Sequence, residues 1–271
     1  MDILVIGDCH GKRPDIPANN FDLILIVGDI CGGSNDVRSA MFEAINEEQE
    51  WYEIYGEERA KKAVKSSIEE GKDILAELNS LEVPVLIVPG NWDWTGENSE
   101  WGFLENKGYP QMLEEYDNIH DINFDSKELE GMKFIGYGPC SGPEIPQYED
   151  DMPSSEEELD HMEADYREKK EELEELFDSE SDIVFLSHNA PNGTELDMID
   201  NPDSPADGRH YGSLVVRDMI EEYSPLLSIG GHIHEGKGNE EVEGVTCVNG
   251  GLHSQAEIKL NEDTVKQIKE V

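Results

Sequence analysis

The stretch Ile3-Leu4-Val5-Ile6-Gly7-Asp8-Cys9-His10 decides the fold, because a short apolar run stops at a glycine and is followed by an aspartate and a histidine. Similar arrangements recur along the chain. Five apolar runs have the length of a strand, and none alternates polar with apolar residues: Ile3–Ile6, Leu23–Val27, Val83–Val88, Ile183–Leu186 and Leu226–Ile229. Runs of this kind are typical of strands that are buried on both faces.

Segments with helical spacing separate several of these runs. Apolar residues recur every three or four positions in Asp36–Tyr55 and in Glu57–Leu81, and Arg217–Tyr223 shows a shorter pattern. This alternation predicts an α/β fold with a largely parallel central sheet and right-handed crossovers. Three short segments near turn glycines are expected to add antiparallel strands: Lys133–Tyr137, Val245–Val248 and Ala256–Leu260.

The chain is strongly acidic, with 63 Asp and Glu against 20 Lys and Arg among 271 residues, a formal net charge of -43. Binding to long nucleic acid is not expected, because the basic groove that it needs is missing. The charge has two explanations, an ordinary acidic cytosolic protein or adaptation to high salt, where counterions screen the repulsion. We favour the second at this magnitude.

The composition also indicates the compartment. No apolar run approaches the roughly 18 residues of a membrane span, and the N-terminus lacks the basic-then-apolar layout of a secretory signal. The four cysteines form no CxxC pair, so reduced thiols are expected. We therefore expect a soluble, cytoplasmic protein that does not bind membranes.

One stretch differs from the rest in composition. Glu144–Asp182 contains 18 acids and 3 bases, and its apolar residues fall at helical spacing. Ser155 followed by Glu158 resembles a capping box. We predict an amphipathic surface helix with an acidic outer face, inserted between core strands, and a solvated face is a better explanation than a binding surface.

Polar residues that bind metals follow each of the five runs. Open α/β folds bind ligands at the carboxyl ends of their parallel strands, so these side chains are expected to converge: Asp8, His10, Asp29, Asn91, His188, His232 and His234. Oxygen and imidazole ligands without thiolates suit Mn, Fe, Co, Ni or Zn. Seven ligands are too many for one ion and suit two, if one carboxylate bridges. Each motif alone is weak evidence, but the ordered set is specific.

The ordered motifs resemble those of the calcineurin-like metallophosphoesterases, whose pattern is D-x-H, G-D, G-N-H-[DE], an isolated His, and G-H-x-H. The resemblance spans about residues 1–260. It implies one domain over 1–271, a β-sandwich flanked by helices (αββα), with the acidic insert at about 144–182. The segments 210–213 and 248–251 look like a small archaeal and bacterial branch of predicted phosphoesterases.

The resemblance also implies roles for the ligands. Asp8, His10, Asp29 and His234 would hold one ion. Asp29, Asn91, His188 and His232 would hold the other, with Asp29 bridging, and manganese is the expected metal. A hydroxide that bridges the ions would attack phosphorus, with Asp29 and Asn91 in the catalytic centre.

The sequence departs from the family pattern at Trp92, where the family has the histidine thought to protonate the leaving oxygen. An indole cannot act as a titrating acid near neutral pH, so a phosphodiester is favoured over a monoester. Trp92 either stacks on an aromatic leaving group or fills space, and Asp93 is left with a structural role. His210, or less readily His253, would supply a proton instead.

The remaining residues complete the prediction. Asn189 and Gly250 are candidates for lining the substrate pocket, although Asn189 also fits a turn. Cys9 is expected to pack in the core. His120 and His161 are expected to lie on the surface. The expected substrate is a small phosphorylated or phosphodiester compound. The alternatives are a phosphomonoesterase that uses His210 as acid, and a non-catalytic scaffold of the same fold. The oligomeric state stays open.

Overall fold

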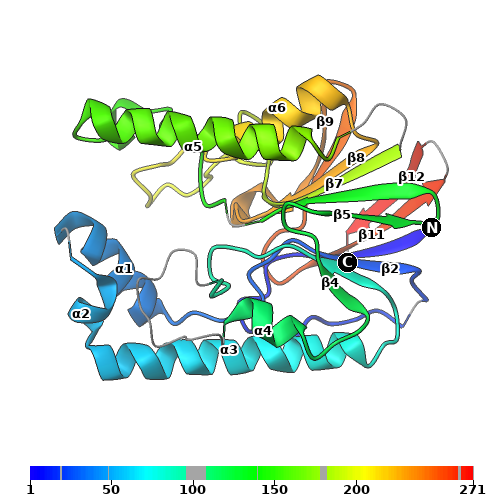
Figure 1. Cartoon of the computed structure of the whole chain (residues 1–271), viewed down its shortest axis with the longest axis horizontal. Coiled ribbons are helices and arrows are strands. Elements are labelled where there is room, and N and C mark those ends of the chain that lie inside the picture. Colours follow the sequence, from blue (N-terminus) through cyan, green and yellow to red (C-terminus); the bar gives the residue numbers. More distant parts are fainter. Residues whose placement is uncertain are drawn as a thin grey trace.

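The computed structural model describes residues 1–18, 20–47, 49–95, 108–138, 140–177, 182–261 and 264–270. In this part of the chain two six-stranded mixed sheets pack face to face between layers of helices (Figure 1). In spatial order the first sheet contains β12 (Thr264–Glu270), β11 (Gln255–Asn261), β1 (Asp2–Ile6), β2 (Leu23–Ile26), β3 (Val85–Ile87) and β4 (Ile119–Asp121). The second contains β5 (Ser126–Leu129), β6 (Met132–Tyr137), β7 (Asp182–Asn189), β8 (Leu227–Gly231), β10 (Val245–Asn249) and β9 (Gly238–Val242).

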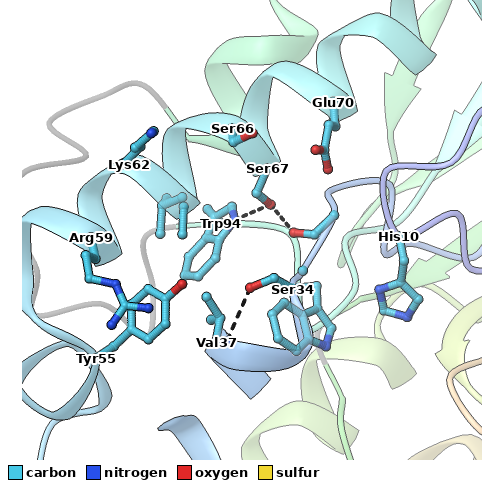
Figure 2. A pocket seen from close by; sticks show the side chains of 15 residues that line it. His10, Ser34, Val37, Tyr55, Arg59, Lys62, Ser66, Ser67, Glu70 and Trp94 are labelled. Atoms are coloured by element: carbon cyan, nitrogen blue, oxygen red, sulfur yellow. Dashed lines mark hydrogen bonds between the residues drawn. The ribbon is translucent and has the colours of Figure 1, made fainter. Parts of the chain in front are cut away.

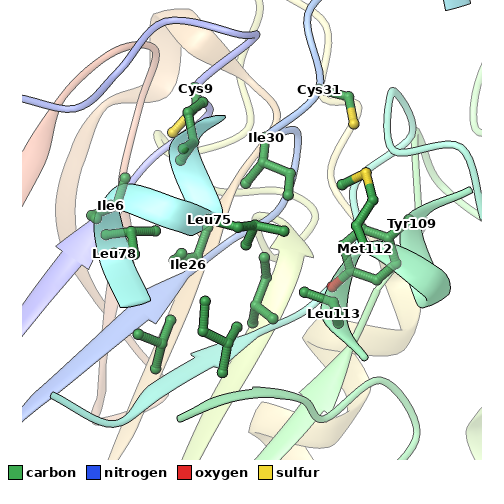
Figure 3. Packing of buried hydrophobic residues seen from close by; sticks show 14 of the residues in the cluster. Ile6, Cys9, Ile26, Ile30, Cys31, Leu75, Leu78, Tyr109, Met112 and Leu113 are labelled. Carbon is green, nitrogen blue, oxygen red and sulfur yellow. The ribbon is translucent and has the colours of Figure 1, made fainter. Parts of the chain in front are cut away.

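Helices cover the outer face of each sheet. The long helix α3 (Glu57–Asn79) and the short α4 (Tyr109–Leu113) pack on the first sheet, where Leu75 and Leu78 meet Ile6 and Ile26 (Figure 3). On the second sheet lie α5 (Glu156–Glu174) and α6 (Leu214–Tyr223), which lie side by side (Figure 1). The remaining helices are α1 (Asn35–Glu47), α2 (Trp51–Tyr55) and the single turns η1 (Glu149–Asp151) and η2 (His234–Gly236).

Alternate residues of each central strand enter different cores. In β1, Leu4 and Ile6 pack toward α3, whereas Ile3 and Val5 join the core between the two sheets. Both faces are therefore covered, one by helices and one by the other sheet. This accounts for the uninterrupted apolar runs, since a strand with one solvated face would alternate.

The predicted α/β class and the sandwich flanked by helices are confirmed, but the single parallel central sheet is wrong. β1, β2 and β3 belong to one sheet, and β7 and β8 to the other. Burial on both faces does not distinguish one sheet covered by two helical layers from two sheets that cover each other. β6 is antiparallel to β5 but parallel to β7. β10 is likewise antiparallel to β9 but parallel to β8. The prediction that they are purely antiparallel additions is therefore wrong, whereas β11 is antiparallel to β1 as predicted.

Two predicted helices have different bounds. The single helix expected over 36–55 is two helices, α1 and α2, and residue 48 between them lies outside the described residues. Helix α6 begins three residues before the predicted start because the Ser213 side chain accepts a hydrogen bond from the Val216 N–H. No helix in the described ranges has both the length and the apolar character to cross a membrane.

The acidic stretch forms the crossover between the parallel strands β6 and β7. Ser155 accepts from the Glu158 N–H at the start of α5, as predicted, and Leu173 is buried against the second sheet. Lys170 binds Asp218 and Glu222 of α6 at 3.0 and 2.5 Å. Residues 178–181 of this stretch lie outside the described residues.

Candidate metal centre

The ends of five strands bring all seven predicted ligands together at one edge of the sandwich. Two of them, Asp8 and His10, follow β1, while Asp29 and Asn91 follow β2 and β3. The second sheet supplies His188 near the end of β7, and His232 and His234 just after β8. The side chains divide into two groups that share Asp29.

The first group combines histidines from both sheets. His10 Nε2 lies 3.2 Å from His234 Nε2 and 3.5 Å from Asp29 Oδ2. His234 Nε2 is 3.9 Å from Asp8 Oδ2. These four residues are the set expected to hold one ion.

The second group forms around His188, which is fully buried. Its Nε2 lies 3.0 Å from Asn91 Oδ1 and 3.8 Å from Asp29 Oδ2. Asp29, His188 and His232 each offer one ligand atom, and these three atoms lie within 4.8 Å of one another. The structure therefore brings the residues of each predicted set close together.

Asp29 is positioned to serve both groups. Its Oδ1 accepts the backbone N–H of Trp92 at 2.7 Å, which fixes the carboxylate. Its Oδ2 is the atom that faces both His10 and His188. One carboxylate oxygen therefore lies between imidazoles of the two groups.

Backbone carbonyls fix the orientation of two imidazoles. A carbonyl can only accept, so His188 Nδ1 donates to Val27 O at 2.8 Å and leaves the Nε2 lone pair for a metal. His232 Nε2 likewise donates to Ser141 O at 3.0 Å and leaves Nδ1. Such outer partners commonly orient histidine ligands of metal ions.

Three of the seven residues have a left-handed backbone. The φ angles of His10, Asp29 and His232 are 43°, 51° and 66°. This conformation costs of order 1–3 kcal/mol for a residue other than glycine and is common at functional sites. A Cβ on Gly90 would lie 2.1 Å from Asp29 Oδ1, so a glycine is required there.

Burial sets the electrostatics of the site. It raises the pKa of Asp29 to about 7, and burial followed by repulsion from Asp29 raises the pKa of Asp8 well above its usual value. Burial also lowers the histidine pKa values, to about 3 for His10 and His232 and about 4 for His188 and His234. The imidazoles are therefore neutral near pH 7, and burial favours the protonated form of the two carboxyl groups.

The donor set fits divalent cations. Within the described ranges, Asp8 Oδ1 and His10 Nδ1 are buried without a hydrogen-bond partner. A buried carboxylate oxygen without a partner is costly unless a cation or proton joins it. Cys9 contributes no thiolate, because it packs in the core as predicted.

Trp92 lies beside the first group. It is 8% exposed, and its ring meets His10 edge-on with centroids 6.1 Å apart. Asp93 accepts the N–H groups of Cys31 and Gly90, both at 2.9 Å, which supports the structural role predicted for it.

Sequence reasoning missed Arg38. Its guanidinium lies 5.4 Å from the centroid of the Trp92 ring. Its charge partly opposes the rise that burial causes in the pKa of Asp29, and it adds to the fall that burial causes in the pKa of His234. A cation is thus placed beside the centre of a highly acidic protein. The only available sequence signal was that no other Lys or Arg occurs between Arg13 and Arg59.

The two alternative proton donors have different surroundings. His210 Nδ1 lies 2.7 Å from Asp197 Oδ1, and the backbone N–H of His210 donates to Tyr148 Oη. No hydrogen bond or ion pair joins His210 to the seven ligands in the described part of the chain. His253 donates its backbone N–H to Asp8 O, and burial lowers the pKa of its imidazole.

The other predicted residues lie as follows. Asn189 is fully buried. Its Nδ2 donates to Tyr211 O and its Oδ1 accepts the Ala190 N–H, so its side chain holds the backbone at these two residues. Gly250 is buried, and a Cβ there would lie 3.0 Å from Gly7 Cα. His161 is exposed as predicted, whereas His120 is half-buried in β4.

Comparison with known proteins agrees with this geometry. Residues 1–236 match the calcineurin-like phosphoesterase family. No curated protein matches the chain. One solved structure aligns over 99% of this chain and 98% of its own with a TM-score of 0.64 at 20% identity.

Two further structures resemble the chain. TT1561 of Thermus thermophilus covers 99% of this chain and 98% of its own, with a TM-score of 0.50 and 15% identity. The phosphopantetheinyl hydrolase PptH of Mycobacterium tuberculosis covers 93% and 89%, with a TM-score of 0.48 and 15% identity. At these identities the likeness concerns the fold.

The fold and the buried Asp and His cluster define a metal-dependent hydrolase of the α/β sandwich type. The chain belongs to the calcineurin-like phosphoesterase family.

Proposed function

We propose that this chain is a two-metal phosphodiesterase that acts on a small substrate. The observation that carries the proposal is the position of Asp29 Oδ2, which lies 3.5 Å from His10 Nε2 and 3.8 Å from His188 Nε2. One ion would be held by Asp8, His10, Asp29 and His234, and the other by Asp29, Asn91, His188 and His232. Oxygen and nitrogen donors of this kind suit Mn²⁺ as well as Fe, Co, Ni or Zn.

When bound, two such ions supply the nucleophile and the positive charge that phosphoryl displacement needs. The residues of the chain prepare the site for them. Carbonyl hydrogen bonds hold His188 and His232 in fixed orientations, and their low pKa values keep the imidazoles unprotonated at neutral pH. Arg38, beside Trp92, adds positive charge that favours the approach of an anionic ester.

Trp92 supports the choice of a diester. It stands where the family pattern has a histidine, beside His10, and its indole has no proton to transfer near pH 7. The leaving oxygen of an alkyl monoester therefore lacks an acid at this position. His210, the alternative acid, is instead bound to Asp197.

The test compares the hydrolysis of bis(p-nitrophenyl) phosphate and p-nitrophenyl phosphate with Mn²⁺ in molar KCl. We expect diester turnover to exceed monoester turnover and Asp29→Asn to abolish both. The exposed Asp15 provides a matched control, and Asp15→Asn should retain wild-type rates. Preferential monoester turnover would overturn the diester assignment, and the absence of turnover in metal-loaded protein would favour a non-catalytic scaffold.

A further inference from the structure

A cavity of about 520 Å³ opens beside the metal centre, with His10 and Trp92 among its lining residues. It lies along α3, and its other sides are lined by residues 32–34, by Val37 of α1 and by Trp94 (Figure 2). His10 stands at one end and Arg59 and Lys62 at the other (Figure 2). The cavity is therefore continuous with the first metal group and leads away from it.

One face of α3 forms a wall of this cavity. Arg59, Lys62, Ser66 and Glu70 line it and recur every three or four residues, which places them on the same side of a helix. At 1.5 Å per residue, Arg59 and Glu70 are about 16 Å apart along the axis. This span suits a nucleotide-sized group that extends from the metal centre.

The two cations at the far end are available for a ligand. Neither Arg59 nor Lys62 has a carboxylate within 4.0 Å among the described residues, although Asp and Glu outnumber Lys and Arg threefold. The neighbouring Lys61, by contrast, binds Glu57 and Glu58 at 2.6 and 3.2 Å. Arg59 stacks over the ring of Tyr55 at 4.2 Å, which holds its guanidinium in place.

Aromatic side chains also line the cavity, and Tyr55 lies beside Arg59 at the end opposite His10 (Figure 2). Trp92, Trp94 and Tyr55 all line the cavity. Trp94 is fixed by a 2.9 Å hydrogen bond from its Nε1 to Ser67 Oγ. Such walls favour a planar ring, because aromatic groups stack on one another.

We propose that this cavity binds one half of the diester substrate, and that this half carries a ring and a second, terminal phosphate. The proposal rests on the proposed function, because it identifies which diesters the centre cleaves. Arg59 and Lys62 bind the terminal phosphate, since Arg and Lys make strong charge-assisted hydrogen bonds to phosphate oxygens. The tryptophans hold the ring, and the scissile phosphate lies at His10.

The dinucleotide TpT and its terminally phosphorylated forms pTpT and TpTp test this directly, because they differ only in the second phosphate. We expect kcat/KM for at least one phosphorylated form to exceed that for TpT by about tenfold, the usual effect of a hydrogen bond to a charged group. The double variant Arg59→Gln, Lys62→Gln should remove this preference, whereas Lys61→Gln should retain it. Equal rates for all three substrates, or a preference that survives in the double variant, would overturn the proposal.

A binding measurement separates failure of the cavity from failure of the proposed function. If the Mn²⁺-loaded protein hydrolyses neither bis(p-nitrophenyl) phosphate nor any of the three dinucleotides, the proposed function is in error. Equilibrium dialysis with thymidine 3′,5′-bisphosphate and thymidine then tests the cavity alone. The bisphosphate should bind at least tenfold more tightly than thymidine, and its affinity should fall about tenfold in the double variant but not in Lys61→Gln. Equal binding of the bisphosphate by all three proteins would contradict the assignment.

Discussion

Replacing Gly90 with alanine is expected to damage the centre although no ligand residue is substituted. The new Cβ would lie 2.1 Å from Asp29 Oδ1 and 2.5 Å from Asp29 N, where no carbon is tolerated. To reach even a tight 3.0 Å contact, the carboxylate oxygen must move by about 1 Å. That movement also strains the 2.7 Å hydrogen bond from the Trp92 N–H.

The magnitude follows from this displacement. Overpacking of a buried site typically costs about 1–3 kcal/mol of stability, so the variant should fold. A misplacement of about 1 Å in a catalytic group typically costs about 10²-fold in rate, and we expect kcat/KM for bis(p-nitrophenyl) phosphate to fall by that factor. Weaker Mn²⁺ binding should accompany the loss.

The assay combines diester turnover, Mn²⁺ titration and thermal unfolding in the same buffer. Gly142→Ala is the matched control, because a Cβ there would have no atom of the described residues within 4 Å. We expect this control to behave as wild type in all three measurements. A folded Gly90→Ala protein with wild-type Mn²⁺ affinity and turnover would refute the argument that close packing on Gly90 positions Asp29.

Three further outcomes are expected. Trp92→His should raise turnover of glycerol 3-phosphate about tenfold or more by supplying an acid, whereas Trp92→Phe should not. Phosphate release measures the turnover. Equal turnover by Trp92→His and wild type would contradict the role assigned to the indole. The pKa of Asp29 is raised to about 7 and that of His188 is lowered to about 4, so Asp29 is the group that gains a proton as pH falls below about 7. Mn²⁺ affinity should therefore weaken below about pH 7. Calorimetry in two buffers at pH 6.5 should show that Mn²⁺ binding releases protons, and Asp29→Asn should reduce this release. With a net charge of -43, the melting temperature should rise between low salt and molar KCl, and a circular-dichroism melt that is unchanged would exclude adaptation to high salt.

The site was more predictable from sequence than the sheets around it. Ligands of α/β folds bind at the carboxyl ends of the parallel strands. Asp8 after β1 and His188 near the end of β7 could therefore be assigned to one edge without knowing which sheet each strand joins. Membership of a sheet depends on pairing between distant segments. An apolar run whose strand is buried on both faces does not indicate which other strands it pairs with.

Long-range partners account for what the sequence did not reveal. Arg38 reaches the centre because α1 places it over Trp92, which follows β3, and no local pattern marks that contact. His210 is bound to Asp197 across a loop, so its sequence context said nothing of its distance from the metals. The left-handed backbone of Asp29 also arises from the surrounding packing.

Counting the bound metal ions tests the central claim most directly. Equilibrium dialysis should show two Mn²⁺ per chain, and paramagnetic resonance should show the two ions magnetically coupled through a shared ligand. In Asp29→Asn we expect the coupling to disappear and at least one ion to bind more weakly, because Asp29 Oδ2 faces both His10 and His188. A single ion per wild-type chain, or two uncoupled ions that Asp29→Asn leaves unchanged, would contradict a two-metal centre bridged by Asp29.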